Sequence, residues 1–254
     1  MRDKQVQMTL IQIDNYGPWT DTLGDDREHR LQMLQASLYS SIQEKFANKD
    51  GLVFFNRFDE MLAVTNGISI EEHLEIQTNI NNHFPFTVSM GIGVGRTPFE
   101  AQYAASKLMQ RAGSAHSNSR KGVLASDITL NSSEAYVQII HIDVDRITET
   151  STDRLSAFET SIKVVAIYAD LMRSFKEYNA LLFYIGGDNF MGVANGITVD
   201  KITSLIKDYH VSDIELKCGI GIAKTGRKAA ELATMNLHKI RQDRNNFILA
   251  TTRM

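Results

Sequence analysis

Two aspartates in the second half of the chain, Asp143 and Asp188, stand where carboxylates can bind a metal and phosphates. Asp143 ends an apolar run. Asp188 follows Gly186 and Gly187 between two further apolar runs, which is typical of a β-hairpin with an acidic tip. Glycine has no Cβ, so a bulky ligand can approach this backbone closely, and Mg²⁺ usually binds through one or two carboxylates plus substrate phosphates. The alternative is a plain tight turn with a solvated aspartate.

The first half of the chain echoes this arrangement. The spacing from Asp14 to Asp143 is the same as the spacing from Asp59 to Asp188, and a Gly-Ile-Gly sequence recurs at a spacing that is one residue shorter. The period is thus about half the chain. Solenoid repeats are only about 20–50 residues long, so a period of this length indicates two tandem copies of one α/β domain instead. We therefore expect an N-terminal domain at 1–120 and a C-terminal domain at 121–254.

Each copy is expected to run strand, helix, hairpin, helix, strand, helix, with a small polar linker at 113–119. Its two carboxylates would converge at one edge of an antiparallel sheet, where they repel each other and a divalent cation would relieve that repulsion. The expected strands are 6–14, 52–55, 61–64, 86–94, 136–143, the hairpin at 181–194, and 214–222. The expected helices are 30–46, 70–82, 98–111, 155–175, 200–209 and 227–241.

Composition limits the class of protein. The 254 residues are 43% apolar, enough for two domains with real cores. A net charge of −3 leaves no basic surplus for nucleic acid. The single cysteine, Cys218, excludes an intrachain disulfide and any zinc site with two or three cysteine ligands. The polar N-terminus and the lack of a long apolar run predict a cytoplasmic protein without a membrane partner.

Several neighbouring residues have two interpretations each. His141 should face the same side of its strand as Asp143, either as a ligand contact or as a hydrogen-bonded structural histidine. Asp145 is either a second ligand or solvated. Tyr16 and Trp19 either pack in the core or stack on a base. The arginines at 57 and 146 either reach phosphates or lie on the surface.

The repeated unit resembles the palm-type domain of GGDEF diguanylate cyclases, class III nucleotide cyclases and some polymerases. Ile142-Asp143-Val144-Asp145 looks like the first metal-binding motif, and Gly186-Gly187-Asp188-Asn189-Phe190 resembles GGDEF itself. This resemblance implies an α+β fold made of two ferredoxin-type palm domains in tandem. Asn189 replaces the glutamate of the GGDEF motif, and the N-terminal copy, at 57–60, lacks both glycines. Synthesis of a cyclic dinucleotide is therefore not expected.

A second resemblance, to the archaeal GTP cyclohydrolase III (or IIa) family, covers nearly the whole chain. It is carried by four long motifs, at 12–20 (Gln-Ile-Asp-Asn-Tyr-Gly-Pro-Trp-Thr), 85–90, 136–139 and 183–191. Glu60 and Arg146 depart from the family pattern, in which asparagine is typical. This resemblance implies hydrolysis of GTP to 2-amino-5-formylamino-6-(5-phosphoribosylamino)pyrimidin-4(3H)-one with phosphate release, in flavin or deazaflavin biosynthesis. It also implies dependence on Mg²⁺, activation by K⁺, no zinc, and a homo-oligomer, either a dimer or a tetramer.

The candidate site residues follow from both resemblances and from the repeat. The candidate catalytic and metal-binding residues are Asp14, Asp59, Asp143 and Asp188, and the candidate nucleotide contacts are Asn15, Tyr16, Gly17, Phe58, His141, Gly186, Gly187 and Asn189. Which half holds the metals stays open. Two other functions are also open: a nucleotidyl cyclase that makes a cyclic product, and an inactive GTP sensor.

Overall fold

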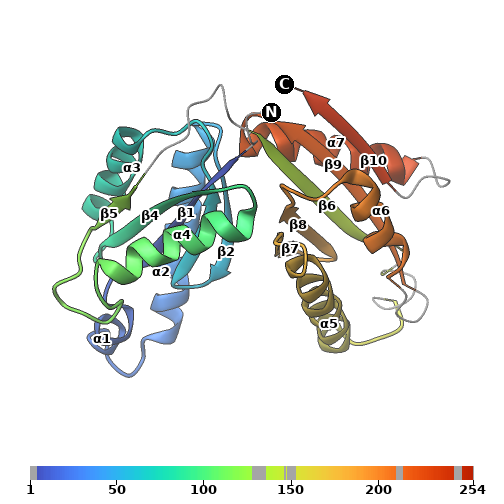
Figure 1. The fold of residues 1–254 in the computed structure, drawn as a ribbon. Helices are drawn as coiled ribbons and strands as arrows, with labels where there is room; N and C mark the ends of the chain where they lie inside the picture. The colour runs from blue at the N-terminus through green and yellow to red at the C-terminus, as the bar shows by residue number, and fades with distance from the viewer. Residues whose placement is uncertain are drawn as a thin grey trace. The chain divides into compact units, whose positions relative to one another are not determined.

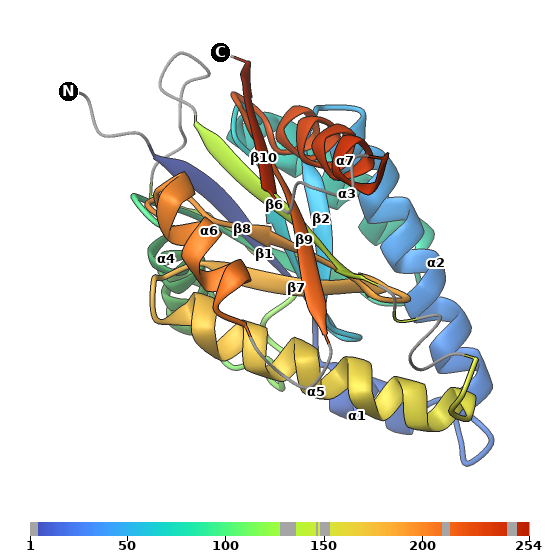
Figure 2. The same cartoon turned by 90° about the vertical axis from the view of Figure 1, so that its right-hand side faces the viewer.

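The computed structural model describes residues 5–127, 136–145, 147, 153–209, 214–242 and 248–253. Arg146, which the sequence singles out, lies outside these residues. The chain divides into two units, residues 1–96 with 100–135 and residues 97–99 with 136–254. Each unit contains one five-stranded sheet (Figures 1 and 2). The first unit extends past residue 120 because the strand at 124–126 pairs into its sheet.

The first unit is built around strand β1, which pairs antiparallel with β3 on one side and with β4 on the other. Its sheet has the order β2-β3-β1-β4-β5, and β5 is parallel to β4. The elements are β1 (Val6–Ile13), α1 (Tyr16–Asp21), α2 (Glu28–Ala47), β2 (Leu52–Arg57), β3 (Glu60–Val64), α3 (Ile70–His83), β4 (Val88–Gly95), α4 (Pro98–Arg111) and β5 (Leu124–Ser126).

The second unit repeats this plan around β6, which pairs antiparallel with β8 and β9. Its sheet has the order β10-β9-β6-β8-β7, and β10 is parallel to β9. The elements are β6 (Val137–Asp145), α5 (Ala157–Lys176), β7 (Leu181–Gly186), β8 (Asn189–Val193), α6 (Val199–Lys207), β9 (Glu215–Ala223), α7 (Gly226–Gln242) and β10 (Ile248–Arg253). The tandem duplication of a palm-like α+β unit is therefore confirmed.

Three elements were not expected from the sequence. Strand β5 has only three residues, and β10 ends in Thr-Thr-Arg, so neither shows the apolar pattern of a buried strand. Helix α1 occupies the segment where a simple chain break was expected. Strands β5 and β10, at one edge of each sheet, run parallel to their neighbours, so only the other four strands of each sheet form the expected antiparallel arrangement.

The two Gly-Ile-Gly sequences allow a helix to pack closely on each sheet. A Cβ built at Gly219 or Gly221 would lie 2.0 Å from a backbone oxygen of α7, at Ala233 and Ala229 respectively. Real Cβ atoms never come this close, so only glycine permits this contact. The repeated glycines are therefore explained by helix packing and not by a ligand.

The strand pairing changes the correspondence between the two units. Gln12 of β1 pairs with Glu60, and Asp143 of β6 pairs with Asn189. Glu60 and Asn189 are separated by the spacing of the repeat. The same spacing relates Asp143 to Asp14, but the residue that pairs in the place of Asp143 is Gln12, two residues earlier. The expected equivalence of Asp14 with Asp143 is therefore wrong, because β1 and β6 are offset by two residues relative to their hairpins.

Backbone contacts just beyond these pairs support the same register. The amide of Ile13 donates to the carbonyl of Asp59 at 3.0 Å, and the amide of Val144 donates to the carbonyl of Asp188 at 3.2 Å. Asp14 therefore corresponds to Asp145. The sequence is misleading here because a slip of two residues keeps the same side chains on the same face of a strand. The sequence Ile-Asp also occurs both at 13–14 and at 142–143, which makes these two segments look equivalent.

Buried His73 on α3 gives the first unit a specific pH dependence. Its Nε2 lies 2.8 Å from Thr9 Oγ1, and its Nδ1 lies 2.6 Å from the Ser69 carbonyl oxygen. Burial lowers its pKa to about 4. In the unfolded chain the ordinary histidine pKa is about 6.5, so between these values the unfolded state binds the extra proton. Stability is complete above about pH 6.5 and falls by roughly 3 kcal/mol as the pH drops through this window.

Urea unfolding at a series of pH values measures this loss. The His73→Gln variant, whose amide retains hydrogen-bonding groups, should be less stable at pH 7 but should lose less stability on acidification. An identical acid dependence in the variant and in the unmodified protein would show that His73 does not titrate in this way.

Candidate active site

In the second unit, β6 and the turn between β7 and β8 bring Asp143 and Asp188 to the same end of the sheet. Gly186 and Gly187 form this turn with positive φ angles of +117° and +60°, where glycine is strongly preferred. A Cβ built on either glycine would meet no heavy atom of the described chain within 4 Å. The expected acidic tip is therefore present, and the space beside its two glycines is open.

A chain of polar contacts joins the two carboxylates. Arg241, near the end of α7, donates from Nε to Asp143 Oδ2 at 3.0 Å and from Nη2 to Asp143 Oδ1. The same Nη2 donates to Asn189 Oδ1 at 3.1 Å, and Asn189 Nδ2 donates to Asp188 Oδ1 at 2.8 Å. Asn189 is thus a link between the two aspartates, in the place where the GGDEF motif has a glutamate.

The electrostatics of the pair favour an added cation. Burial raises the pKa of Asp188, and the nearby charge of Asp143 raises it further. Hydrogen bonding to Asp143 raises the pKa of Arg241. The Arg241 side chain is 41% exposed, so it can also meet an incoming anion. Two clustered carboxylates beside a cationic fork suit a metal–phosphate ligand.

Arg241 was not among the residues predicted for the site. It lies 98 residues from Asp143 in the chain, and its only sequence signal is a basic side chain in the last turn of a helix. That signal is common at helix ends, where a cation favourably interacts with the helix dipole. Only the packing of α7 on the sheet shows that this arginine reaches the acidic tip.

His141 lies two residues before Asp143 on β6 and is almost fully buried. Its Nδ1 is 3.0 Å from Thr234 Oγ1, and its Nε2 is buried without a hydrogen-bond partner among the residues described. Burial lowers the pKa of His141, so the ring is neutral near pH 7. One ring nitrogen thus has a structural partner, while the other keeps its hydrogen-bonding capacity.

Asp145 is partly exposed and is held in an ion pair by a buried lysine. Lys217 of β9 donates from Nζ to Asp145 Oδ1 at 2.8 Å, and the lysine side chain is only 8% exposed. The neighbouring strand therefore neutralises the second aspartate of the Asp-Val-Asp sequence.

A cavity of about 480 Å³ opens beside the acidic tip. Gly187 and Asp188 form its polar end, and Thr160 Oγ1 is buried with no hydrogen-bond partner in the described chain. The remaining lining residues are Ile147, Ser161, Val164, Val165 and Tyr184. Apolar walls with a few polar groups and a charged end suit a nucleotide whose phosphates lie at the tip.

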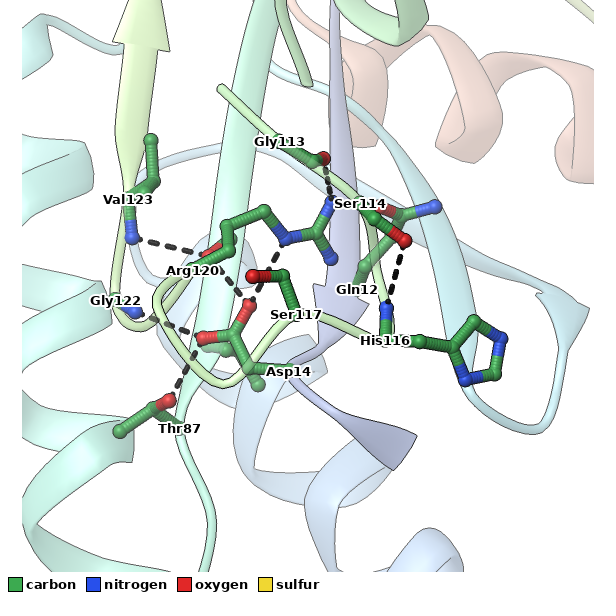
Figure 3. A network of polar contacts seen from close by, with 12 residues as sticks. Gln12, Asp14, Thr87, Gly113, Ser114, His116, Ser117, Arg120, Gly122 and Val123 are labelled. Atoms are coloured by element: carbon green, nitrogen blue, oxygen red, sulfur yellow. Dashed lines mark hydrogen bonds and ion pairs between the residues drawn. The ribbon is translucent and has the colours of Figure 1, made fainter. Parts of the chain in front are cut away.

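The corresponding region of the first unit is organised differently. Figure 3 shows Asp14 surrounded by donors. Asp14 Oδ2 accepts from Thr87 Oγ1 and from the Gly122 amide, both at 2.7 Å, and Oδ1 accepts from Ser89 Oγ at 2.6 Å. The buried Arg120 places Nε 3.5 Å from the same Oδ1. Both oxygens of Asp14 are thus occupied by protein groups, which makes this carboxylate a structural anchor.

The segment expected to be a linker packs against this anchor instead. The Asn15 amide donates to the Ala115 carbonyl at 2.9 Å, and Asn15 Nδ2 donates to Asn118 Oδ1 at 2.7 Å. A Cβ built on Gly17 would lie 3.2 Å from the ring of His116, so glycine permits this close packing. Asn15 and Gly17, two predicted nucleotide contacts, therefore hold residues 113–122 in place.

The aromatic residues after Asp14 belong to the packing of the first unit. Tyr16 accepts a hydrogen bond from Gln35 Nε2 at 2.7 Å, and its pKa is raised by burial and by the charge of Asp59. Trp19 packs edge-on against Phe86 with ring centroids 4.7 Å apart. Both rings also contact the apolar core. Of the two interpretations open for these residues, core packing is the one that the contacts favour.

The acidic tip of the first unit is held by its own neighbours. Glu60 accepts hydrogen bonds from Gln12 Nε2 and Asn56 Nδ2, each at 2.5 Å. Asp59 lies 3.5 Å from Arg57 Nη2, and Phe58 is exposed in the place of Gly187. Because Gln12 stands where the second unit has Asp143, this tip lacks the counterpart of the Asp143 and Asp188 pair. Asp14 instead lines a smaller cavity of about 350 Å³ with Trp19 and others.

A bound metal at the second tip would need ligands from outside the protein. The described residues contain no group of three or more His, Cys, Asp or Glu side chains that could hold a metal ion. Two carboxylates fit Mg²⁺ when phosphate oxygens and waters complete its shell.

Among the residues that the structure describes, no helix is long and apolar enough to cross a membrane.

Residues 8–253 match the model of a family described as GTP cyclohydrolase III. A protein with that name from Methanothermobacter thermautotrophicus is 50% identical over 93% of this chain and 94% of its own length. A relative with the same name from Methanocaldococcus jannaschii is 47% identical over 93% of this chain and 88% of its own length.

Two solved structures each match about half of the chain. The GGDEF domain of DgcB from Caulobacter crescentus, in complex with c-di-GMP, covers 46% of this chain and 79% of that one at 12% identity, with a TM-score of 0.39. The GGDEF domain of PA1120 from Pseudomonas aeruginosa covers 47% and 83% at 19% identity, also with a TM-score of 0.39.

Proposed function

The chain belongs to the GTP cyclohydrolase III family, and we propose from this that it hydrolyses GTP. The product is 2-amino-5-formylamino-6-(5-phosphoribosylamino)pyrimidin-4(3H)-one, formed by opening the imidazole ring without loss of formate, and phosphate is released. The relatives of the same name span nearly the whole chain, so the activity belongs to both units together.

We place the phosphate-binding and catalytic end of the site at the tip of the second unit. The observation that carries this choice is the contact chain from Asp143 through Arg241 and Asn189 to Asp188. The first unit has Gln12 in the place of Asp143 and has both oxygens of Asp14 in use. Of the four candidate aspartates, Asp143 and Asp188 are thus the two proposed to act on the substrate.

The donor set of this tip fits Mg²⁺. Asp143 and Asp188 offer hard carboxylate oxygens. Burial raises the pKa of Asp188 most, and the repulsion from Asp143, which raises it further, would be relieved by a cation between the two carboxylates. When bound there, Mg²⁺ neutralises charge on the phosphates and lowers the pKa of a coordinated water. Activation by K⁺ is a further expectation.

The protein groups have distinct tasks in this proposal. Arg241 presents a planar fork of donors to the phosphate oxygens, and the backbone at Gly186 and Gly187 lets them approach closely. The cavity on α5 receives the nucleoside, with Thr160 Oγ1 as a hydrogen-bonding group and Val164 as an apolar wall that excludes water. The asparagine at 189 keeps the two aspartates aligned.

The ultraviolet spectrum of a GTP reaction, with and without Mg²⁺, tests the proposal. A formamidopyrimidine absorbs differently from intact guanine, so ring opening is seen directly. The expected result is a spectral change that requires Mg²⁺, with release of phosphate. A cyclic guanine nucleotide as product would indicate a nucleotidyl cyclase. Thermal stabilisation by GTP without turnover would indicate a sensor.

A further inference from the structure

His141 on β6 has one ring nitrogen that the fold leaves without a partner. The residue is only 9% exposed. Its Nδ1 lies 3.0 Å from Thr234 Oγ1 of α7, whereas its Nε2 is buried and has no hydrogen-bond partner within the described part of the chain. Buried polar atoms are nearly always paired, so an unpaired one indicates a role beyond packing.

The packing of α7 on the sheet explains how the first nitrogen is held. His141 lies opposite Gly219 of β9, and a Cβ built on Gly219 would lie 2.0 Å from the backbone oxygen of Ala233. Because glycine lets α7 come this close, the next residue of the helix, Thr234, reaches the imidazole ring. The ring is thus anchored at Nδ1, and Nε2 is the nitrogen that keeps its hydrogen-bonding capacity.

The first unit shows that the fold does not demand a histidine at this position. By strand pairing, Leu10 is the equivalent of His141, because Leu10 lies opposite Gly91 as His141 lies opposite Gly219. Leu10 is 4% exposed. An apolar side chain thus fills the same buried position in the unit that lacks the pair of aspartates. The imidazole occurs in the unit that has this pair.

Asn189 is the polar side chain that Nε2 is placed to serve. Asn189 pairs with Asp143, two residues along β6 from His141, so His141 and Asn189 are diagonal neighbours on one face of the sheet. Diagonal neighbours have Cα atoms about 7–8 Å apart, which is within reach of a ring side chain. Burial lowers the pKa of His141, and the Asn189 side chain opposes this shift, in agreement with a short separation.

Asn189 also has a hydrogen-bond donor to spare. Its Nδ2 donates to Asp188 Oδ1, and its Oδ1 accepts from Arg241 Nη2. An amide nitrogen carries two protons, so one proton is left for a further acceptor. A neutral imidazole whose Nδ1 donates to Thr234 presents Nε2 as such an acceptor. The two groups therefore match in this tautomer of His141.

We propose that His141 is a positioning residue, which holds the Asn189 amide in place when Arg241 turns to the substrate phosphates. This inference rests on the proposed function, in which the phosphates attract the guanidinium fork of Arg241. The contact from Arg241 to Asn189 is then weakened, and Asn189 needs another anchor. Anchored by Nε2, Asn189 keeps one oxygen of Asp188 in its hydrogen bond and leaves the other free for Mg²⁺. His141 itself contacts neither the substrate nor the metal.

Two substitutions at position 141 separate the two ring nitrogens. The shorter His141→Asn side chain keeps a polar atom near the Nδ1 position, toward Thr234, whereas His141→Gln places its amide near the Nε2 position, toward Asn189. His141→Asn should lower kcat for GTP about 10–100-fold, the usual effect of losing a partner that orients a metal ligand. His141→Gln should lose clearly less. Equal losses, or the larger loss in His141→Gln, would overturn the proposal.

His141→Leu separates the effect on activity from the effect on folding. It copies the first unit at Leu10 and removes both nitrogens, while the Thr234 hydroxyl can bond a carbonyl of its own helix. Thermal melts should show the variant folded, and its kcat should fall as far as that of His141→Asn. A folded His141→Leu variant with unchanged kcat would contradict the positioning role.

A double-mutant cycle tests whether His141 acts through Asn189. In the Asn189→Ala background, His141→Asn should cause no further loss of kcat, because the amide that His141 holds is already absent. If the two single losses multiply instead, the residues act independently and the proposal is wrong.

Equilibrium binding of a non-hydrolysable GTP analogue with Mg²⁺, measured by calorimetry, gives a readout without turnover. The affinity should fall at least about tenfold in His141→Asn and less in His141→Gln. His73→Gln is the matched control, because His73 is also buried but lies in the first unit. It should lose stability and keep its affinity for the analogue. A loss of affinity in this control equal to that in His141→Asn would overturn the proposal.

The binding measurement also separates this inference from the proposed function. Absence of GTP turnover in the unmodified protein would overturn the proposed function, and the order of affinities among the variants would still decide the role of His141.

Discussion

Replacement of Asp188 by asparagine is expected to lower kcat for GTP by about 10³-fold, because charge neutralisation at the phosphates contributes several kcal/mol. The variant should nevertheless be at least as stable as the unmodified protein. Burial and Asp143 raise the pKa of Asp188, so its charged form is disfavoured in the folded state relative to the unfolded state. Removing that charge relieves the repulsion. The amide oxygen of the introduced asparagine can still accept the hydrogen bond that Asn189 donates.

Asp59→Asn is the matched control, since Asp59 is at the same position of the first hairpin. It should retain kcat within about tenfold, because the first unit has Gln12 where the second unit has the carboxylate of Asp143. Steady-state rates of ring opening and thermal melts, measured on both variants, give the comparison. Equal losses of kcat in the two variants would contradict the assignment of the reaction to the second tip.

Replacement of Arg120 by alanine is expected to lower the free energy of unfolding by about 3–5 kcal/mol, the usual cost of removing one partner of a buried ion pair. Arg120 and Asp14 are both nearly inaccessible, with 2% of each side chain exposed. The guanidinium also donates to Gln12 Oε1 at 3.2 Å. Without Arg120, the Asp14 carboxylate would keep its neutral hydrogen-bond donors but lose its positively charged partner. Urea unfolding followed by circular dichroism measures the change.

A double-mutant cycle separates the ion pair from simple loss of packing. Asp14→Asn removes the charge, so Arg120→Ala should cost clearly less in that background than in the unmodified protein. The acidic tip of the second unit predicts a contrast: Arg241→Ala should affect catalysis more than stability, since this arginine is partly exposed. Strictly additive effects of Asp14→Asn and Arg120→Ala would show that the two groups are not coupled.

Much of the fold can be predicted from the sequence, because apolar spacing is a direct physical signal. The stripe at Leu38, Ile42 and Phe46 and the runs around β1 and β6 place the main helices and strands within a few residues. The duplication follows from repeated landmarks. Strands β5 and β10 escape prediction because each is an edge strand whose stability depends on its neighbour and not on its own pattern.

The candidate site is predicted only in part. The acidic glycine turn at 186–188 is visible in the sequence because its residue types are unusual. The role of Asp14 is not visible, since a catalytic and a buried structural aspartate look alike until Thr87, Ser89 and Arg120 are seen around it. The two arginines come from distant segments, so only the packed structure brings each one to its carboxylate.

The position of the bound metal decides which tip acts on GTP. Fe²⁺ can take the place of Mg²⁺ in oxygen-ligand sites, and with peroxide it cuts the backbone nearest to it. With a non-hydrolysable GTP analogue bound, the cut fragments can be mapped by mass spectrometry. We expect cuts at 143–145 and 186–189. Cuts at 12–16 and 57–60, with the second tip intact, would contradict the assignment of the catalytic metals to Asp143 and Asp188.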